Sequence, residues 1–153
     1  MKKFLPLSVI PFIFILDRVT KWGVLDALRE GQSIPVWVGV FHFTRVNNTG
    51  AAFGILRGGA AFLALISALC VAGLFAVIIR SFFIKKPAVG LAGNLALALV
   101  VSGAAGNLYD RIRYGYVIDF LDFRIWPVFN IADSAICVGI FLIILLMIKT
   151  RKA

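Results

Sequence analysis

The chain has 153 residues, of which 61% are hydrophobic and 15% are charged, and its mean hydropathy is +1.00. This composition lies outside the range of soluble globular proteins and indicates a protein embedded in a membrane. The formal net charge is +9. The basic excess lies in short clusters beside apolar segments, where it orients the chain and meets anionic lipid, so no nucleic-acid partner is expected.

The first apolar segment predicts a transmembrane helix over residues 4–25. Its uncharged part ends at Leu16, so a spanning helix carries Asp17, Arg18 and Lys21 into the far interfacial region. Two lysines followed by an apolar run are also typical of a cleavable signal peptide. No small-x-small cleavage site precedes Asp17, and we therefore expect the segment to be retained as a span.

Residues 26–57 are the first stretch expected outside the membrane. Within it, the run from Val36 to Val46 is rich in β-branched and aromatic residues, which predicts a strand. The next four residues, Asn47-Asn48-Thr49-Gly50, are typical of a turn. We expect a small sheet on the outer membrane surface, from which Trp37, Phe41 and Phe43 reach the interface.

Three more spans are predicted, over residues 58–79, 88–109 and 131–148. The first of them has no charge over 22 residues, and a helix of this length crosses a hydrocarbon core of about 30 Å. Residues 110–130 form a second, shorter segment outside the membrane. Because almost the whole chain belongs to the spans, we expect a single domain over residues 1–153.

Charge placement predicts the orientation in the membrane. Basic residues without any acidic ones lie at the two termini and between the second and third spans: Lys2, Lys3, Arg80, Lys85, Lys86, Lys149, Arg151 and Lys152. Basic clusters stay on the cytoplasmic side, so both termini are expected in the cytoplasm. The number of spans is then even, and four spans fit.

Few kinds of catalytic group are available in the segments expected at the outer face. His42 is the only histidine, lies in the predicted strand, and has no cluster of metal ligands beside it. Cys70 and Cys137 lie inside predicted helices without a histidine partner, which indicates packing roles. A serine–lysine hydrolase has only Lys21 available on this side. The carboxylates remain, and the candidates are Asp17, Asp110, Asp119, Asp122 and Asp133.

Asp133 is a strong candidate because of its depth. It lies about 24 Å of helix from Lys149, which places it inside a hydrocarbon core of about 30 Å. Placing an ionisable group at this depth costs free energy, so such a residue is expected to have a functional role. The alternative role is to cap its helix, for which Asn130 is better placed.

Asp119 is the second strong candidate because apolar residues flank it on both sides. It lies between Val117-Ile118 and Phe120-Leu121, and such a carboxylate requires a partner. The alternative to a carboxylate pair is a structural ion pair with Arg111, Arg113 or Arg124. Asp122 and Arg124 are expected in a solvated loop.

The third predicted span carries a polar stripe. Gly103, Asn107 and Arg111 are spaced i, i+4 and i+8, so they share one helix face near the outer end, and Asp110 adjoins them. The small residues of segment 102–106 favour close packing of helices. Asn107 and Arg111 are expected to face a polar cleft and to hold its carboxylates.

These residues resemble the lipoprotein signal peptidase family of bacterial inner-membrane aspartyl proteases, also called signal peptidase II. Four blocks in order, over nearly the whole chain, make the resemblance specific. Ser102 departs from the family, which often has glycine there, without touching a catalytic position. The blocks are Asp17-Arg18-Val19-Thr20-Lys21, Asn48-Thr49-Gly50-Ala51-Ala52-Phe53, Gly103 to Arg111 followed by Asp119-Phe120, and Phe129-Asn130-Ile131-Ala132-Asp133.

The resemblance implies a fold and an activity. The fold is an all-α integral membrane protein, with four transmembrane helices, a small extracytoplasmic β-cradle and a short outer-face helix. Asp119 and Asp133 are implied as the catalytic dyad. The residues expected to support the site or to bind substrate are Asp17, Lys21, Asn48, Gly103, Asn107, Arg111 and Asn130.

The implied enzyme is an aspartic endopeptidase of the cytoplasmic membrane, with its site at the extracytoplasmic face. Its substrate is a diacylglyceryl-modified prolipoprotein, cut on the N-terminal side of the lipidated cysteine. No cofactor and no metal are expected. The expected partners are the substrate and membrane lipids, and the expected state is a monomer.

Three other classes of membrane protein are alternatives to this enzyme. A transporter or proton-relay subunit lines a path across the membrane with carboxylates, whereas every acid here lies at one face. A non-catalytic chaperone or lipid-binding module would tolerate the loss of either aspartate. Another intramembrane aspartyl protease would show a Gly-x-Gly-Asp pattern, which the sequence does not contain.

Overall fold

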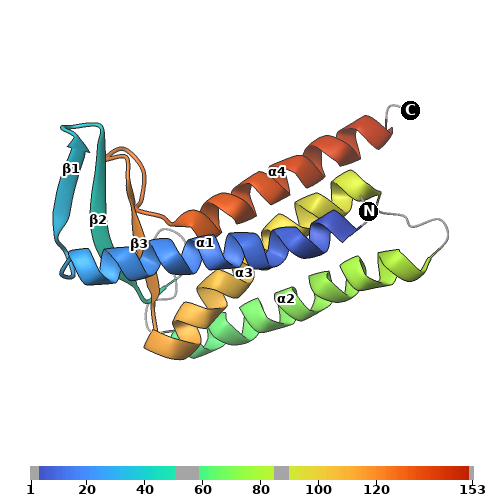
Figure 1. Ribbon diagram of the computed structural model, residues 1–153, viewed down its shortest axis with the longest axis horizontal. Helices are drawn as coiled ribbons and strands as arrows, with labels where there is room; N and C mark the ends of the chain where they lie inside the picture. Colours follow the sequence, from blue (N-terminus) through green and yellow to red (C-terminus); the bar gives the residue numbers. More distant parts are fainter. Residues whose placement is uncertain (1–3, 51–58, 85–89, 152–153) are drawn as a thin grey trace.

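A computed structural model describes residues 4–50, 59–84 and 90–151, which form four helices and three strands (Figure 1). The helices are α1 (Leu5–Ala27), α2 (Ala60–Phe83), α3 (Leu91–Tyr114) and α4 (Ile131–Arg151), and the strands are β1 (Ser33–Trp37), β2 (Phe41–Asn48) and β3 (Val117–Asp122). Each predicted span overlaps one helix. The helices continue past the predicted ends of the spans, so Arg80 lies within α2 and Arg111 within α3.

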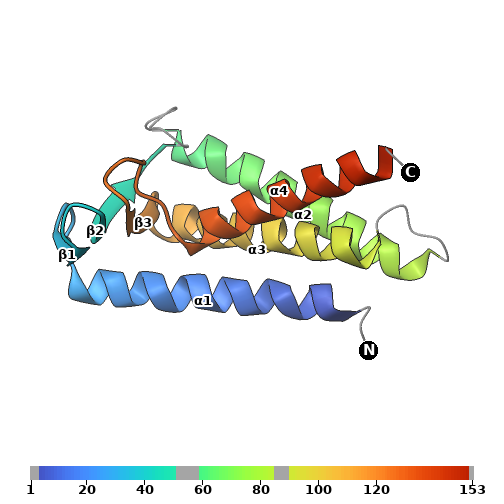
Figure 2. The same ribbon diagram turned by 90° about the horizontal axis from the view of Figure 1, so that it is seen from above.

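Helix α3 lies at the centre of the bundle and contacts the other three helices (Figure 2). Half of its most apolar stretch is buried, against 11% for α2 and 17% for α4. A Cβ at Gly106 would lie 2.7 Å from the Asp17 carboxylate, and one at Gly139 would lie 2.7 Å from the Ala96 carbonyl oxygen. These glycines therefore let α1 and α4 approach α3 closely.

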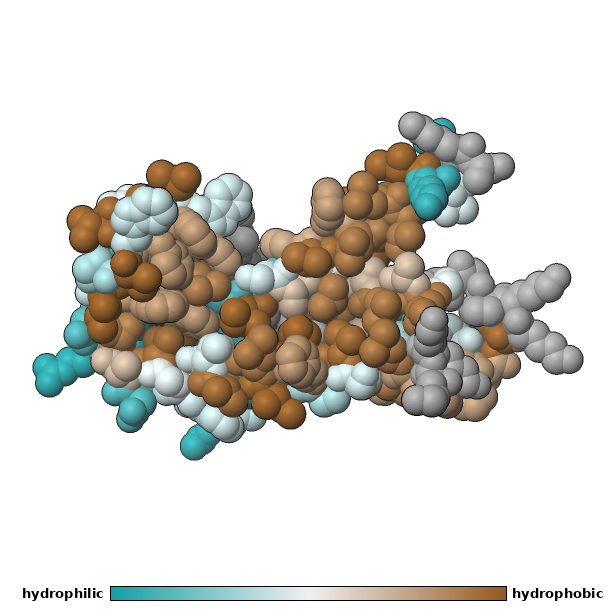
Figure 3. Space-filling view, turned by 45° about the horizontal axis from the view of Figure 1, so that its top comes forward, coloured by the Kyte–Doolittle hydropathy of each residue, from teal (hydrophilic) through white to brown (hydrophobic). Residues whose placement is uncertain are grey.

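Three helical stretches in the described ranges are long and apolar enough to cross a membrane: Ala61–Phe83, Leu91–Tyr114 and Ile131–Arg151. Helix α1, which carries Asp17, Arg18 and Lys21, is not one of them by length and composition. Apolar residues cover most of the helical surface, and hydrophilic residues gather beside the sheet (Figure 3). Such a surface suits contact with lipid along the helices.

The three strands form an antiparallel sheet in the order β1-β2-β3. The sheet lies at one end of the helices, while α1 begins and α4 ends at the opposite end (Figure 1). Strand β3 packs against the end of α1 through a small core of Val24, Leu28, Ile118 and Phe120. This core fixes the sheet relative to the bundle.

The first outer segment folds as a hairpin and not as the single strand predicted over 36–46. Strand β1 ends at Trp37, and residues 38–40 turn the chain, with the Val40 N–H donating to the Trp37 carbonyl at 3.0 Å. Gly39 has φ of 75°, which residues with a side chain rarely adopt. The strand prediction counted β-branched residues and overlooked this turn signal. His42 lies in β2, as expected.

Strand β3 is not predicted from the sequence, which indicates only that Asp119 lies between apolar residues in the segment 110–130. In the sheet, Asp119 pairs with Val46, and Val117 pairs with Asn48. The short outer-face helix is not among the elements of the described ranges. Residues 51–53 of the second sequence block lie outside the described residues. The single-domain organisation stays a prediction.

Candidate active site

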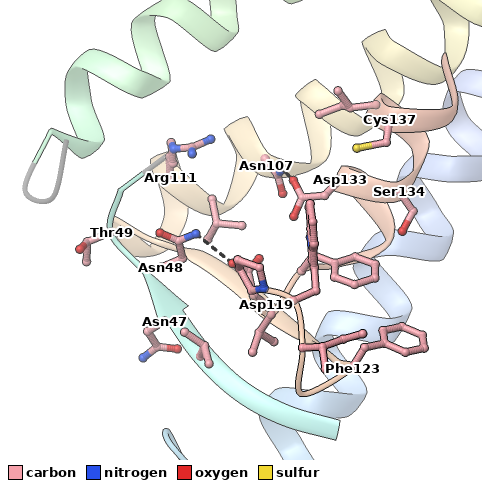
Figure 4. A pocket seen from close by; sticks show the side chains of 18 residues that line it. Asn47, Asn48, Thr49, Asn107, Arg111, Asp119, Phe123, Asp133, Ser134 and Cys137 are labelled. Atoms are coloured by element: carbon pink, nitrogen blue, oxygen red, sulfur yellow. Dashed lines mark hydrogen bonds between the residues drawn. The ribbon is translucent and has the colours of Figure 1, made fainter. Parts of the chain in front are cut away.

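A pocket of about 1320 Å³ opens between the end of β2, the C-terminal part of α3, the loop after β3 and the start of α4 (Figure 4). The loop lines it with apolar side chains that include Phe123, Ile125 and Trp126. Its polar lining comprises Asn47, Asn48, Thr49, Asn107, Arg111, Asp119, Asp133 and Ser134. An apolar pocket with a few convergent polar groups is the default candidate for a catalytic site.

Asp119 lies in β3 with only 2% of its surface exposed. Its carboxylate accepts hydrogen bonds from Nδ2 of Asn48 at 2.9 Å and from Nδ2 of Asn130 at 2.7 Å. The ion pairs of the described residues do not include Asp119, so they give no support to the alternative of an arginine partner. Burial, followed by the charge of Asp133, raises the pKa of Asp119 to about 7.

Asp133 lies in the first turn of α4 and shares the helix cap with Asn130. The Asn130 Oδ1 accepts the Asp133 N–H at 2.8 Å, and the Asp133 Oδ2 accepts the Asn130 N–H at 3.3 Å. This reciprocal arrangement is a capping box, with Asn130 as the cap residue. The other oxygen, Oδ1, accepts a hydrogen bond from Asn107 Nδ2 at 2.7 Å. Asp133 therefore takes part in the cap and also lines the pocket.

Two asparagines link the two aspartates. Asn130 Nδ2, which donates to Asp119, also donates to the Asn107 Oδ1 at 3.1 Å. Asn107 in turn donates to Asp133, so the order of contacts is Asp119, Asn130, Asn107, Asp133. Figure 4 shows Asp119, Asn107 and Asp133 around one cavity. Two carboxyl groups with amide partners can divide one proton between them, and such a pair can activate water.

Arg111 lines the pocket from the last turn of α3, across from the aspartates (Figure 4). Its Nη2 donates to the Gly50 carbonyl oxygen at 3.2 Å. The Gly50 N–H donates to the Asn48 Oδ1 at 3.0 Å, as in the turn predicted for this segment. A guanidinium carries five N–H donors, so Arg111 is suited to bind carbonyl oxygens of a ligand.

Asp17 and Lys21 do not line the pocket. They are fully buried beside it, as is Asp110 of α3, and they lie together with Arg18 of α1, which is 4% exposed. The Lys21 Nζ lies 2.6 Å from an Asp110 oxygen and 3.1 Å from an Asp17 oxygen, and Arg18 pairs with both aspartates. These four residues are called the buried ion cluster below. The sequence analysis names Asp110 as a candidate carboxylate and Arg18 as a charge in the first span, but it does not predict that these two side chains pair with each other.

Gly103 also lies outside the pocket lining, at the contact between α3 and α4. A Cβ at this position would overlap the carbonyl oxygen of Ala132, the residue before Asp133. Glycine therefore lets the start of α4 approach α3, which brings Asp133 within reach of Asn107.

Asp122 is not in a solvated loop, contrary to expectation. It ends β3 with 5% of its surface exposed, and it accepts hydrogen bonds from Thr44 Oγ1 at 2.7 Å and from Arg124 Nη1 at 2.9 Å. Burial acts to raise the pKa of Asp122, but these hydrogen bonds outweigh it and lower the pKa below its usual value. The burial of Asp122 cannot be predicted from the sequence, because it depends on the pairing of β2 with β3, which are distant in the chain.

The two cysteines are exposed and not packed in the core, contrary to expectation. Cys137 lines the pocket on α4, one turn after Asp133. Hydrophobicity cannot separate a helix face that meets lipid from one that meets protein, because both are apolar. This is why the sequence pattern gave the wrong environment.

Comparisons with known proteins agree with each other. The family described as signal peptidase (SPase) II matches residues 9–149. The lipoprotein signal peptidase of Halothermothrix orenii is 41% identical over 94% of this chain and 95% of its own length. That of Syntrophus aciditrophicus is 41% identical over 99% and 98%. A solved bacterial membrane enzyme superposes with a TM-score of 0.85 at 34% identity, covering 96% of this chain and 89% of that one.

Proposed function

Because the chain belongs to the lipoprotein signal peptidase family, whose members cleave signal peptides from lipoprotein precursors, we propose that Asp119 and Asp133 are its catalytic dyad. The chain is thus a hydrolase of the aspartic signal peptidase type. The observation that supports the dyad is that both carboxyl groups line one pocket and have amide partners joined to each other. Among the described residues, Asp119 and Asp133 are the carboxyl groups that line that pocket.

Asp119 suits the protonated role because burial raises its pKa to about 7. Asp133 then takes a proton from water as the water oxygen attacks the scissile carbonyl carbon. Asp119 donates its proton to the carbonyl oxygen, which gives a tetrahedral diol. When the C–N bond breaks, Asp133 returns its proton to the leaving nitrogen and Asp119 regains one from a hydroxyl. The dyad ends in its starting state without a cofactor.

The proposed substrate is a diacylglyceryl-modified prolipoprotein, cut on the N-terminal side of its lipidated cysteine. The resemblance to the family carries this choice, and the pocket is consistent with it. Apolar side chains of the loop after β3 and of α4 line one part of the pocket, and they would contact acyl chains. Asn48 and Arg111 offer hydrogen-bond donors for the peptide carbonyls.

The proposed topology has four transmembrane helices, with α1 as the first, and both termini in the cytoplasm of a bacterial inner membrane. The dyad then lies at the extracytoplasmic face. Support comes from α1 beginning and α4 ending at the end of the bundle opposite to the sheet (Figure 1). We also propose that the chain forms one domain and acts as a monomer among membrane lipids.

The test is cleavage of a synthetic diacylglyceryl-modified prolipoprotein peptide by purified protein in detergent. Asp119→Asn and Asp133→Asn should each lower kcat by about 10³-fold or more, because each removes a proton carrier of the reaction. Asp122→Asn is the matched control, since it alters the same strand outside the pocket lining. Substantial cleavage by either dyad variant would reject the dyad.

A further inference from the structure

The buried ion cluster, formed by Asp17, Arg18, Lys21 and Asp110, has no place in the proposed chemistry. The exposed fractions of Asp17, Lys21 and Asp110 are 0%. Burying an ion cluster is costly, and apolar side chains of similar volume often give equal stability. Stability alone is therefore a weak explanation for these four charges, so what they contact outside the cluster is informative.

Each aspartate of the cluster binds the backbone next to one member of the dyad. The Asp110 Oδ2 accepts the N–H of Ile118 at 3.2 Å, and Ile118 directly precedes Asp119. The Asp17 Oδ1 accepts the N–H of Ala132 at 3.1 Å, and Ala132 directly precedes Asp133. In both contacts a cluster carboxylate accepts the backbone N–H of the residue before a dyad aspartate. The first contact holds strand β3, and the second holds the start of α4.

Lys21 joins these two contacts. Its ammonium lies 3.1 Å from Asp17, 2.6 Å from Asp110 and 3.0 Å from the Asn107 Oδ1. The contact with Asn107 is a hydrogen bond, and the contacts with the two carboxylates are ion pairs. Lys21 therefore fixes the positions of both cluster aspartates relative to Asn107.

The contact with Lys21 also sets which way the Asn107 amide points. An ammonium can only donate, so the carbonyl oxygen of Asn107 must face it. The same oxygen accepts from Asn130 at 3.1 Å. The amide nitrogen is then directed to Asp133, to which it donates at 2.7 Å. Without Lys21, the hydrogen bond from the ammonium that holds the amide in this orientation is lost.

We propose that Lys21 is a positioning residue of the peptidase reaction, which holds Asp119 and Asp133 in register through Asp110, Asp17 and Asn107. It touches neither the pocket nor the dyad directly. The inference rests on the proposed role of the dyad. It assigns to the buried ion cluster the task of keeping a strand and a helix start at the separation that the reaction requires.

The test replaces Lys21 with methionine, which has a similar length and no charge. In the Lys21→Met variant, kcat per folded molecule should fall about 100-fold, the scale seen when groups that orient reacting residues are lost. KM should stay within about threefold, because Lys21 does not line the pocket. Thr20→Val is the matched control, since the Thr20 hydroxyl bonds only to the backbone of its own helix; its kcat should equal that of the wild type.

The pH profile separates positioning from a general loss of structure. The charged groups that act on Asp119 are Asp133, Lys21 and Arg111. The Lys21 ammonium favours the ionised form, so Lys21→Met should raise the pKa of Asp119 and move the basic limb of the profile to higher pH. In Lys21→Met/Asp110→Asn the charge of the cluster is balanced again, but the ammonium that acts on Asp119 is still absent, so the limb should stay at the higher pH and kcat should stay low.

A kcat within about threefold of wild type in folded Lys21→Met, or in the double variant, would overturn the proposal. It would also fail if neither variant folded in a detergent where Thr20→Val folds, because the cluster would then be purely structural. Activity in Asp119→Asn would instead reject the dyad itself. The two failures are therefore distinguishable.

Discussion

The pocket and the buried ion cluster each contain two aspartates, and the aspartates differ in their partners. Asp17 and Asp110 are paired with the ammonium and guanidinium groups of Lys21 and Arg18. Asp119 accepts hydrogen bonds from two amides instead, and its pKa rises to about 7. A cation stabilises a buried carboxylate as an ion, whereas an amide supports it more weakly and leaves it able to exchange a proton. Asp17, Asp110 and Asp119 are all buried, so the two regions differ in the kind of partner that each carboxylate has.

The largest expected effect comes from removing a cluster aspartate. Asp110→Ala leaves Arg18 and Lys21 with an uncompensated buried charge, and breaking such a pair costs about 3–5 kcal/mol of unfolding free energy. Asp119→Ala leaves two amide donors without their acceptor, which costs about 1–3 kcal/mol. Removal of the repulsion from Asp133 offsets part of this cost, so the net loss should be smaller than in Asp110→Ala. Thermal unfolding in detergent compares them. Equal losses of stability in the two variants would abolish the contrast between the regions.

A smaller effect concerns stability and pH. Between the ordinary value of 3.8 and about 7, folded Asp119 holds a proton that the unfolded chain has lost. Stability of the wild type therefore falls as pH rises through this window, and the penalty is complete above it. Asp119→Asn removes the penalty, so its melting temperature should exceed that of the wild type by more at about pH 8 than at about pH 5.

Asp122→Asn is the control for this experiment, and its melting-temperature difference from the wild type should change with pH in the opposite direction. Hydrogen bonds lower the pKa of the Asp122 carboxyl below its usual value of 3.8. The ionised carboxyl therefore stabilises the folded wild type above that pH, and this stabilisation is lost when the pH falls through the lowered pKa. A melting-temperature difference that does not change with pH in Asp119→Asn would contradict the raised pKa.

The sequence predicts the helices and the two pocket aspartates for a clear physical reason. An apolar stretch of about 20 residues has few alternatives to a membrane helix, and a carboxyl group at its mouth has few structural uses. The capping role of Asn130 was also visible, because a cap is a local feature. These predictions depend on neighbours in the chain.

The parts that the sequence does not predict depend on distant contacts. Arg18 meets Asp110 across 92 residues, and Thr44 meets Asp122 across 78. Strand β3 is short, and its pairing with β2 gives it the conformation that its composition alone leaves open. The positions of Asp17 and Lys21 beside the pocket, and not in it, follow from the same long-range packing.

The smallest expected effect concerns a single amide partner of the dyad. Asn48 donates to Asp119, and this hydrogen bond acts to lower the pKa of the carboxyl. Asn48→Ala should therefore raise the pKa of Asp119 and move the basic limb of the kcat/KM profile to higher pH, with an activity loss of about tenfold. Asn47→Ala, which alters the neighbouring pocket residue, should leave the limb in place. An unmoved limb in Asn48→Ala would exclude the amide as a determinant.

The most direct measurement is an infrared titration of the carboxyl groups of the purified protein. The raised pKa of Asp119 predicts an absorption of a protonated carboxylic acid that disappears as pH rises through about 7. This titration should be absent from Asp119→Asn and retained in Asp122→Asn. A spectrum without such a titration, or one in which it persists in Asp119→Asn, would contradict the assignment of Asp119 as the proton-holding member of the pair.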